Sequence, residues 1–258
     1  MIDLYQFSLL SILLAGTAII LAITEVGWRL GRRVSRKGGD HTPSLEGPML
    51  GLLALMVGFT FAMALSRFEA RRDAVLNEAN AIGTTALRAR LLPEPHRAEV
   101  LKLLREYVKI RLDVTQRSSS RIEVVAAIDR SNAIQENLWQ HAKAVAAKDN
   151  SMVPSGLFIQ TLNEMIDSQA KRLAALRNRV PNIVVVALFG IAAVAGGFAG
   201  YSTGFDKRRS RIPVMVMGVV IAGVIILILD VDRPADGFID VSQQPMLDTA
   251  ASLEAFTD

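Results

Sequence analysis

The chain has 258 residues, of which 51% are hydrophobic, and it contains three histidines and no cysteine. The lack of cysteine excludes disulfides and thiolate metal sites, and the hydrophobic fraction is too high for an ordinary soluble domain. The net charge of +4 does not predict nucleic-acid binding, because membrane proteins are often basic through their cytoplasmic loops.

Four apolar runs reach the length that crosses a bilayer and contain no Asp, Glu, Lys or Arg: about residues 4–23, 47–65, 180–200 and 212–229. A charge in the middle of a bilayer costs at least about 2.5–3.5 kcal/mol, and buried helices of soluble proteins rarely stay uncharged for so long. We therefore predict an all-α polytopic membrane protein with four transmembrane helices. Residues 1–65 and 180–229 would each form a membrane hairpin.

The second run continues without a helix breaker as far as Leu92, which Pro93 follows. One helix over residues 47–92 would be about 65–70 Å long, roughly twice the thickness of the hydrocarbon core. The pattern therefore predicts a helix that crosses the membrane with its first half and enters water with its second half.

Residues 66–179 are expected to form an extramembrane four-helix bundle, built from this extension and three further helices. Each of the three carries apolar side chains at helical spacing. Examples in chain order are Val100, Leu104 and Tyr107, then Ile134 and Leu138, then Phe158 and Leu162. The last helix is expected to run directly into the third span.

Short basic loops favour the cytoplasmic side of a membrane. The two loops between paired spans, residues 29–37 and 206–211, are both basic; their cationic residues are Arg29, Arg32, Arg33, Arg36, Lys37, Lys207, Arg208, Arg209 and Arg211. This places the bundle and both termini on the outer side. The acidic tail, residues 230–258, is expected to be ordered because it contains apolar residues such as Phe238 and Leu247.

No residue pattern indicates an enzyme, because the nucleophile elbow, the zinc-protease motif and the phosphate loop are all missing from the sequence. His41, His96 and His141 are far apart and have no cysteine or cluster of carboxylates at ligand spacing. We therefore expect no metal site and no cofactor, and we assign the histidines surface or helix-capping roles.

Small residues recur at four-residue spacing in and after the third span: Ala192, Gly196, Gly200 and Gly204. Small side chains allow two helix backbones to approach closely, which replaces the missing hydrophobic drive in lipid. The pattern predicts a tight helix–helix seam, either within one subunit or between two.

At the end of the second span, Arg67, Arg71 and Glu78 fall on one face of the predicted helix. One interpretation is a charged helix whose arginines reach the membrane surface. The alternative is a set of charges at the mouth of a pore, with an apolar neck that gates by dewetting. The residues assigned to the lining or gate are Met56, Phe59, Thr60, Met63 and Ser66.

A second charged motif, Asp230, Asp232 and Arg233, closes the fourth span. One interpretation is that this motif ends the helix before a packed tail. The alternative is that Asp230 and Asp232 pair with the arginine cluster at the end of the second span or bind a cation.

Three stretches carry a family resemblance: FTFAMALSRFEARRDAVLNEANAIGTTALRARLLPE (59–94), LNEMID (162–167) and ILDVDRPADGFIDVSQQP (228–245). From about Gly47 to Leu253 the chain resembles the bacterial bestrophin-like membrane family, a family defined by a domain of unknown function. Bestrophins are pentameric four-span anion channels whose second helix lines the pore. The resemblance therefore implies a bacterial inner-membrane protein, a homo-oligomer (a pentamer by analogy), with the bilayer and inorganic ions as its partners. Bestrophins keep their helical region in the cytosol, the reverse of the charge-based topology.

The leading hypothesis is a homo-oligomeric ion pore lined by the second span, in which Arg67 and Arg71 favour anions through their positive potential. The alternative is a sensory or scaffolding membrane protein that acts through a separate partner chain. An enzyme is the least favoured class.

Overall fold

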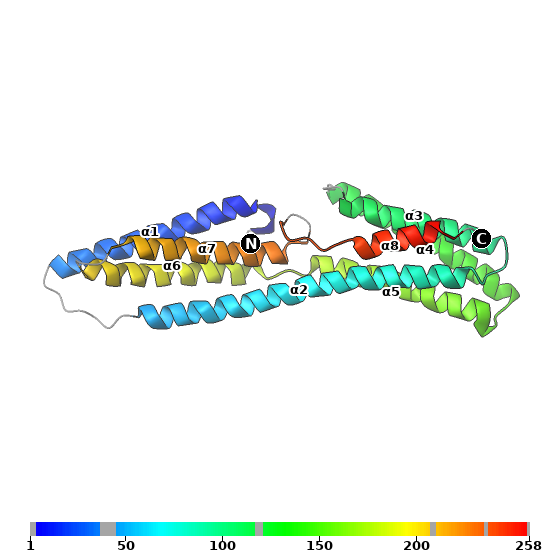
Figure 1. Cartoon of the computed structure of the whole chain (residues 1–258), viewed down its shortest axis with the longest axis horizontal. Helices are drawn as coiled ribbons and strands as arrows, with labels where there is room; N and C mark the ends of the chain where they lie inside the picture. Colours follow the sequence, from blue (N-terminus) through cyan, green and yellow to red (C-terminus); the bar gives the residue numbers. More distant parts are fainter. Residues whose placement is uncertain (1–3, 37–44, 117–120, 207–209, 235–236, 257–258) are drawn as a thin grey trace. The chain divides into compact units, whose positions relative to one another are not determined.

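The computed structural model describes residues 4–36, 45–116, 121–206, 210–234 and 237–256. Within these ranges every regular element is helical and no strand is present. The α-helices are α1 (Leu9–Arg36), α2 (Glu46–Ala89), α3 (His96–Gln116), α4 (Arg121–Lys148), α5 (Leu157–Arg177), α6 (Asn182–Phe205), α7 (Ile212–Asp232) and α8 (Gln244–Glu254), as drawn in Figure 1. Two short helices, Leu4–Gln6 and Met152–Gly156, precede α1 and α5.

Four of the described helices are long and apolar enough to cross a membrane: α1, α2, α6 and α7. This confirms the predicted all-helical class and its four candidate spans. The first helix begins at Leu9 and continues to Arg36, so the basic segment that was expected to be a loop is largely the end of this helix. Lys37 and residues 207–209 lie outside the described ranges.

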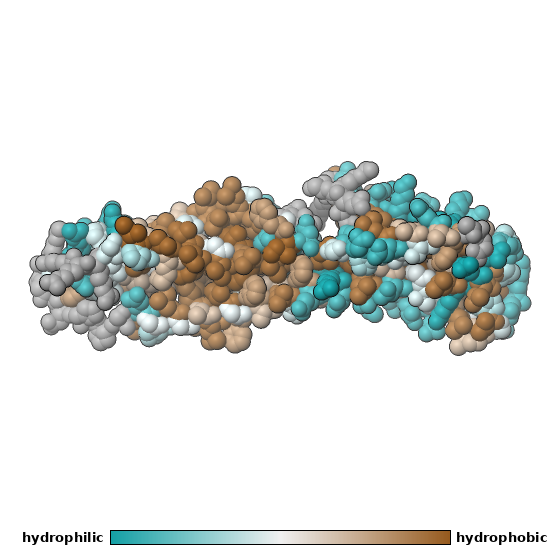
Figure 2. Space-filling model, viewed as in Figure 1, coloured by the Kyte–Doolittle hydropathy of each residue, from teal (hydrophilic) through white to brown (hydrophobic). Residues whose placement is uncertain are grey.

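The chain divides into two compact units. The first contains residues 1–68 and 179–239, and the second contains residues 69–178 and 240–258, so that α2 contributes to both. Figure 2 shows a broad hydrophobic surface over the helices of the first unit and a mostly hydrophilic surface over the second.

In the first unit, α1 packs against α6 and α7. The buried core between these helices includes Ile20, Leu188, Ala192 and Ile225, and the α2 side chain Leu53 joins the same cluster. Large apolar side chains also remain exposed on these helices, for example Leu14 on α1 and Val220 on α7, as expected for helices that face lipid.

In the second unit, the later part of α2 packs with α3, α4, α5 and α8 around a single apolar core. The helical stripes predicted from the sequence lie in that core: Val100, Leu104, Tyr107, Leu138, Phe158 and Leu162 are all buried. The helix α8 contacts α3 and buries Met246 and Leu253. The described residues of the C-terminal tail are divided between the two units, and Phe238 and Leu247, the apolar residues on which the expectation rested, are exposed.

The predicted continuous helix from α5 into the third span is wrong. The helix α5 ends at Arg177, Asn178 has extended backbone angles (φ −79°, ψ 112°), and α6 begins only at Asn182. Pro181 explains the break, because a proline ring disfavours helical geometry at the residue before it.

Candidate functional site

The apolar part of α2 has one face turned to its own unit and one face left open. Leu53, Thr60 and Ala64 are buried, whereas Phe59 is 64% exposed and Met63 38% exposed. Ser66 is exposed as well. Phe59, Met63 and Ser66 follow one another at spacings of four and three residues, so they share one helix face.

The other two predicted lining residues face the first unit. Met56 packs against its apolar core, and the hydroxyl of Thr60 donates a hydrogen bond to the carbonyl of Met56 at 2.7 Å. A threonine satisfied by its own helix in this way can lie in an apolar environment without leaving an unpaired polar atom.

The predicted mouth charges are mostly buried. Arg71 is 2% exposed and Glu78 fully buried inside the second unit, while Arg67 in the first unit is half-buried. The three charges do share one helix face, as the spacing predicted, but it is the face of α2 that packs inward.

The opposite face of α2 in the second unit carries oxygen-bearing side chains. Glu69, Asp73, Asn77 and Asn80 are exposed, and Thr84 continues the row in a half-buried position. Their spacings of three and four residues place them on one stripe of the helix. We call these five residues the oxygen stripe.

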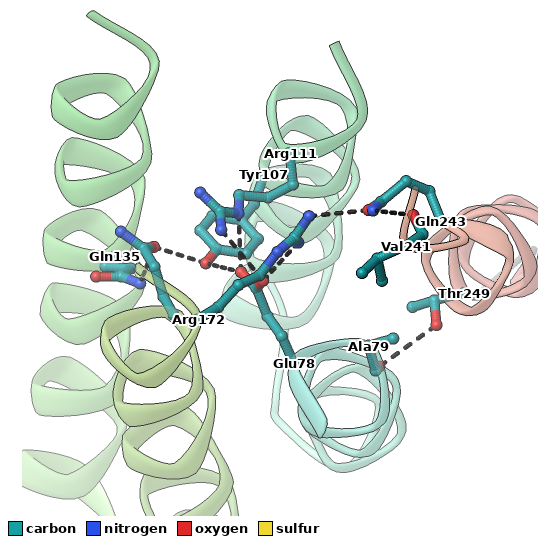
Figure 3. Close-up of polar contacts among 10 residues, drawn as sticks. Glu78, Ala79, Tyr107, Arg111, Gln135, Arg172, Val241, Gln243 and Thr249 are labelled. Carbon is teal, nitrogen blue, oxygen red and sulfur yellow. Dashed lines mark hydrogen bonds and ion pairs between the residues drawn. The ribbon is translucent and has the colours of Figure 1, made fainter. Parts of the chain in front are cut away.

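Glu78 lies at the centre of a buried polar network (Figure 3). One of its carboxylate oxygens is 2.8 Å from Nε of Arg111, and the other is 2.7 Å from Nη1 of Arg172. The hydroxyl of Tyr107 is 2.8 Å from Glu78 Oε1 and 2.6 Å from Gln169 Oε1. Because a hydroxyl has one proton, it donates to one of these oxygens at a time.

The network joins α2, α3, α4 and α5 of the second unit to the segment that precedes α8. Gln135 on α4 donates to Gln169 at 2.6 Å, and Arg172 on α5 donates to Gln243, which immediately precedes α8, at 2.8 Å. The hydroxyl of Thr249 on α8 also donates to the carbonyl of Ala79 on α2 at 3.3 Å. The polar network therefore fixes the inward face of α2 to α3, α5 and the C-terminal segment.

Burial raises the pKa of Tyr107 well above its ordinary value, and the negative charge of Glu78 raises it further. Tyr107 therefore remains a neutral hydroxyl that donates a hydrogen bond within the network. Buried charge clusters of this kind contribute little net stability when intact but are costly to break.

The small-residue seam lies within the chain, between α1 and α6. A Cβ atom on Gly200 would lie 2.2 Å from the carbonyl oxygen of Thr24, and one on Gly204 would lie 2.1 Å from that of Trp28. The contact is reciprocal, since a Cβ on Gly27 of α1 would lie 2.1 Å from the carbonyl oxygen of Gly197. Ala192 and Gly196 are buried on the same helix.

The C-terminal motif ties chain segments together inside the first unit. Asp232 accepts hydrogen bonds from the hydroxyl of Tyr5 and from the backbone N–H of Val180, the latter at 2.8 Å. Arg233 donates to the carbonyl of Phe7 at 2.6 Å. The sequence contained no signal for these contacts, because the partners come from parts of the chain more than 50 residues away.

Asp230, near the end of α7, binds the backbone of the tail. Its Oδ1 atom accepts the backbone N–H of Phe238 at 2.7 Å, and a Cβ atom on Gly237 would lie 2.8 Å from that same oxygen. Glycine at position 237 therefore allows a close approach of backbone and carboxylate.

Among the described residues, no group of three or more His, Cys, Asp or Glu side chains is close enough to hold a metal ion. The structure does bring together two of the three histidines: Nδ1 of His96 lies 3.1 Å from Nδ1 of His141. Burial lowers the pKa of His96, with further contributions from His141 and Lys148. The sequence gave no sign of this pair, because its members are 45 residues apart.

A family model for the Bestrophin-like domain matches residues 17–246. The chain belongs to the bestrophin-like family. The bestrophin-like assignment made from the sequence motifs is thereby confirmed, and with it the description of the chain as a helical membrane protein. No curated protein matches the chain.

Solved structures similar to this bestrophin-like chain include a bacterial bestrophin homologue from Klebsiella pneumoniae. One variant of that homologue is 14% identical, with a TM-score of 0.69 and coverage of 96% of each chain. A second structure of the homologue is 15% identical, with a TM-score of 0.67 and coverage of 95% of this chain and 96% of that one. At such low identity the likeness shows that the fold is shared.

Proposed function

We propose that this bestrophin-like chain forms a homo-oligomeric ion-conducting pore lined by the exposed face of α2. The observation that carries the proposal is the change in character along that face. Phe59 and Met63 are apolar, Ser66 is polar, and the oxygen stripe follows on the same helix. Within the described residues only α2 has such a face, so several copies, five by analogy with bestrophins, would be needed to surround a lumen.

Within the pore, Phe59 and Met63 would form the apolar neck. A narrow ring of such side chains holds water poorly and can close a pore by dewetting. Met56 and Thr60 would support the neck from behind, because they face the helices of their own unit.

The exposed charges favour cations over the anions expected from the sequence. The expectation of anion conduction rested on Arg67 and Arg71, but Arg71 is buried and Arg67 half-buried. In a ring of subunits, Glu69 and Asp73 would instead form rings of carboxylates, which are typical of cation-conducting pores.

The test is ion flux through purified protein in planar bilayers. Phe59→Ala should change unitary conductance or open probability, because it widens the neck. Phe61→Ala is the matched control: it is the same change two positions away, on a different face of α2. Equal currents in wild type and Phe59→Ala would argue strongly against this lining.

Ion preference is measured from the reversal potential in a KCl gradient. We expect the reversal potential of the wild type to lie toward the K⁺ equilibrium potential and that of Asp73→Asn to lie closer to zero. The control is Asp129→Asn, at an exposed position of α4, which should leave the reversal potential unchanged. A wild-type reversal potential close to the Cl⁻ equilibrium potential would instead support the anion conduction expected from the sequence. A protein that is monomeric and shows no current would favour the alternative function, a sensory or scaffolding protein with a separate partner.

A further inference from the structure

A tryptophan with two arginines beside it, in the first unit, is a feature that the proposed pore does not use. Trp28 lies near the end of α1 and is half-buried. The guanidinium carbon of Arg32, one turn further along α1, lies 4.9 Å from the centre of the Trp28 ring. That of Arg211, which immediately precedes α7, lies 5.0 Å from the ring centre. Cationic side chains from two distant parts of the chain are therefore held at one aromatic ring.

The cluster around Trp28 carries more positive than negative charge. Arg29 and Arg211 share the carboxylate of Glu25, at 2.9 Å and 3.0 Å. Arg32 is exposed and has no ion pair with another of the described residues. Asp206, the exposed residue that caps α6, adds one more negative charge at this end of the unit. Three arginines still outnumber two carboxylates, so the cluster can attract an anion.

Trp28 sets the depth at which these cations lie in a bilayer. Its helix α1 is one of the candidate spans, and tryptophan rings favour the level of the lipid headgroups. A guanidinium is attracted to the face of an aromatic ring, and its N–H groups lie in its own plane, where they can donate to a phosphate as a fork. The cluster therefore presents hydrogen-bond donors at the depth of lipid phosphates.

The surface that continues from the cluster along α7 is apolar. Ile212 directly follows Arg211 and is 66% exposed, and Val216, one turn further, is 55% exposed. A ligand that contacts both the cluster and this surface has an anionic phosphate head and an apolar chain. A soluble phosphate compound would use only the basic part.

We propose that Trp28, Arg32 and Arg211 form a binding site for an anionic phospholipid. The lipid phosphate pairs with the two guanidiniums, and an acyl chain lies along the exposed face of α7 that begins at Ile212. Basic side chains close to the membrane surface attract anionic headgroups. Glu25 competes with the phosphate for Arg211 and so limits the affinity. The site is independent of the proposed pore, since it requires neither an oligomer nor conduction.

The experiment is quenching of Trp28 fluorescence in vesicles by phospholipids that carry bromine on an acyl chain. The chain contains two tryptophans, so Trp139→Phe in the full-length protein leaves Trp28 as the single emitter. We expect brominated phosphatidylglycerol to bind beside Trp28 at least about fivefold more tightly than brominated phosphatidylcholine, because one arginine near a membrane surface contributes about that factor. Equal quenching by the two lipids would overturn the proposal.

Three substitutions separate a built site from diffuse attraction to the basic end of α1. Arg32→Gln should lower the preference for phosphatidylglycerol by about fivefold. The matched control is Arg33→Gln, which removes the same charge at an exposed position about 100° further around the helix and should have a much smaller effect. Glu25→Gln should raise the preference, because Arg211 no longer has a competing carboxylate. Equal losses in the two arginine variants, or a loss in Glu25→Gln, would overturn the site.

Native mass spectrometry distinguishes a lipid from a soluble phosphate and does not need the Trp139→Phe substitution. Wild-type protein in detergent, mixed with phosphatidylglycerol, should retain at least one lipid per chain, and Arg32→Gln should retain less. Glycerol 3-phosphate carries the same phosphate without acyl chains, so a millimolar concentration should not displace the lipid. Complete displacement by glycerol 3-phosphate, or no lipid retained by the wild type, would contradict the proposal.

Discussion

The helices inside the first unit pack together in a different way from those inside the second unit. In the first, α1 and α6 meet backbone to backbone through glycines, so that a Cβ atom on Gly204 would lie 2.1 Å from the carbonyl oxygen of Trp28. In the second, helices are separated by full side chains, and Glu78, Arg111 and Arg172 form a charged cluster inside the apolar core.

The difference follows from the solvent that each unit is suited to. Lipid tails are as apolar as Leu, so helices in a membrane gain little from burying large side chains and depend on close van der Waals packing. A bundle with a hydrophilic surface gains from apolar burial, which is not directional. Buried polar contacts with defined geometry can then select one arrangement of the helices.

The largest expected effect comes from removing the charge at the centre of the second unit. Glu78→Gln takes away the carboxylate that Arg111 and Arg172 share. Breaking a buried pair by removing one partner costs about 3–5 kcal/mol. We expect this loss in the free energy of unfolding measured in denaturant. Glu106→Gln, on an exposed part of α3, should stay within about 0.5 kcal/mol of the wild type.

The matching change in the first unit is Gly204→Ala. The added Cβ meets backbone, which cannot move aside as a flexible side chain can, so α1 and α6 must separate. Overpacking of this kind costs about 1–3 kcal/mol, measured as a lower melting temperature in detergent. Gly190→Ala on the same helix is the control, because a Cβ there would meet nothing within 4 Å. A similar loss of stability in both variants would contradict close backbone packing between α1 and α6 at Gly204.

A smaller effect is expected from Tyr107→Phe. The change keeps the ring in the core but removes the hydroxyl that bridges Glu78 and Gln169. Glu78 Oε1 and Gln169 Oε1 each keep a second partner, Arg111 and Gln135 respectively. The loss should therefore be that of one intramolecular hydrogen bond, about 0.5–1.5 kcal/mol, which denaturant unfolding would detect. If Tyr107→Phe and Glu78→Gln are combined, the losses should be less than additive, because both act on one network.

The smallest effect is expected at the surface of the second unit. Glu94 and Arg97 form an ion pair at 2.7 Å, but their side chains are 50% and 33% exposed. Exposed pairs contribute about 0–1 kcal/mol because solvent screens them. Glu94→Gln should therefore change the melting temperature by less than any of the core variants. If Glu94→Gln destabilised the protein as much as Glu78→Gln, the claim that the buried charge matters more than the exposed pair would be wrong.

Much of the fold could be predicted because its signals are local. An apolar run of spanning length identifies a membrane helix from its own residues, and the stripes at Val100, Leu104 and Leu138 identify amphipathic helices in the same way. The prediction of one continuous helix through α5 and α6 was wrong because of Pro181. A proline disfavours helical geometry at the residue before it, and this effect outweighed the apolar pattern on either side.

The candidate site was less predictable, because a helical spacing shows that residues share a face but not what that face contacts. Arg71 and Glu78 lie on one face of α2, but that face is buried in the second unit, and the exposed face carries Asp73 and Asn77 instead. No window of sequence that contains α2 alone distinguishes these two arrangements.

The sequence by itself therefore determined the helical class, the four candidate spans, the family and, through the helical spacing, which residues of α2 share a face. The tertiary structure decided which of those faces is buried, that the glycine seam joins α1 to α6 of the same chain, and that His96 meets His141. The physical reason is that helix period and hydropathy are set by neighbours in the chain, whereas burial and pairing depend on which distant helices pack together.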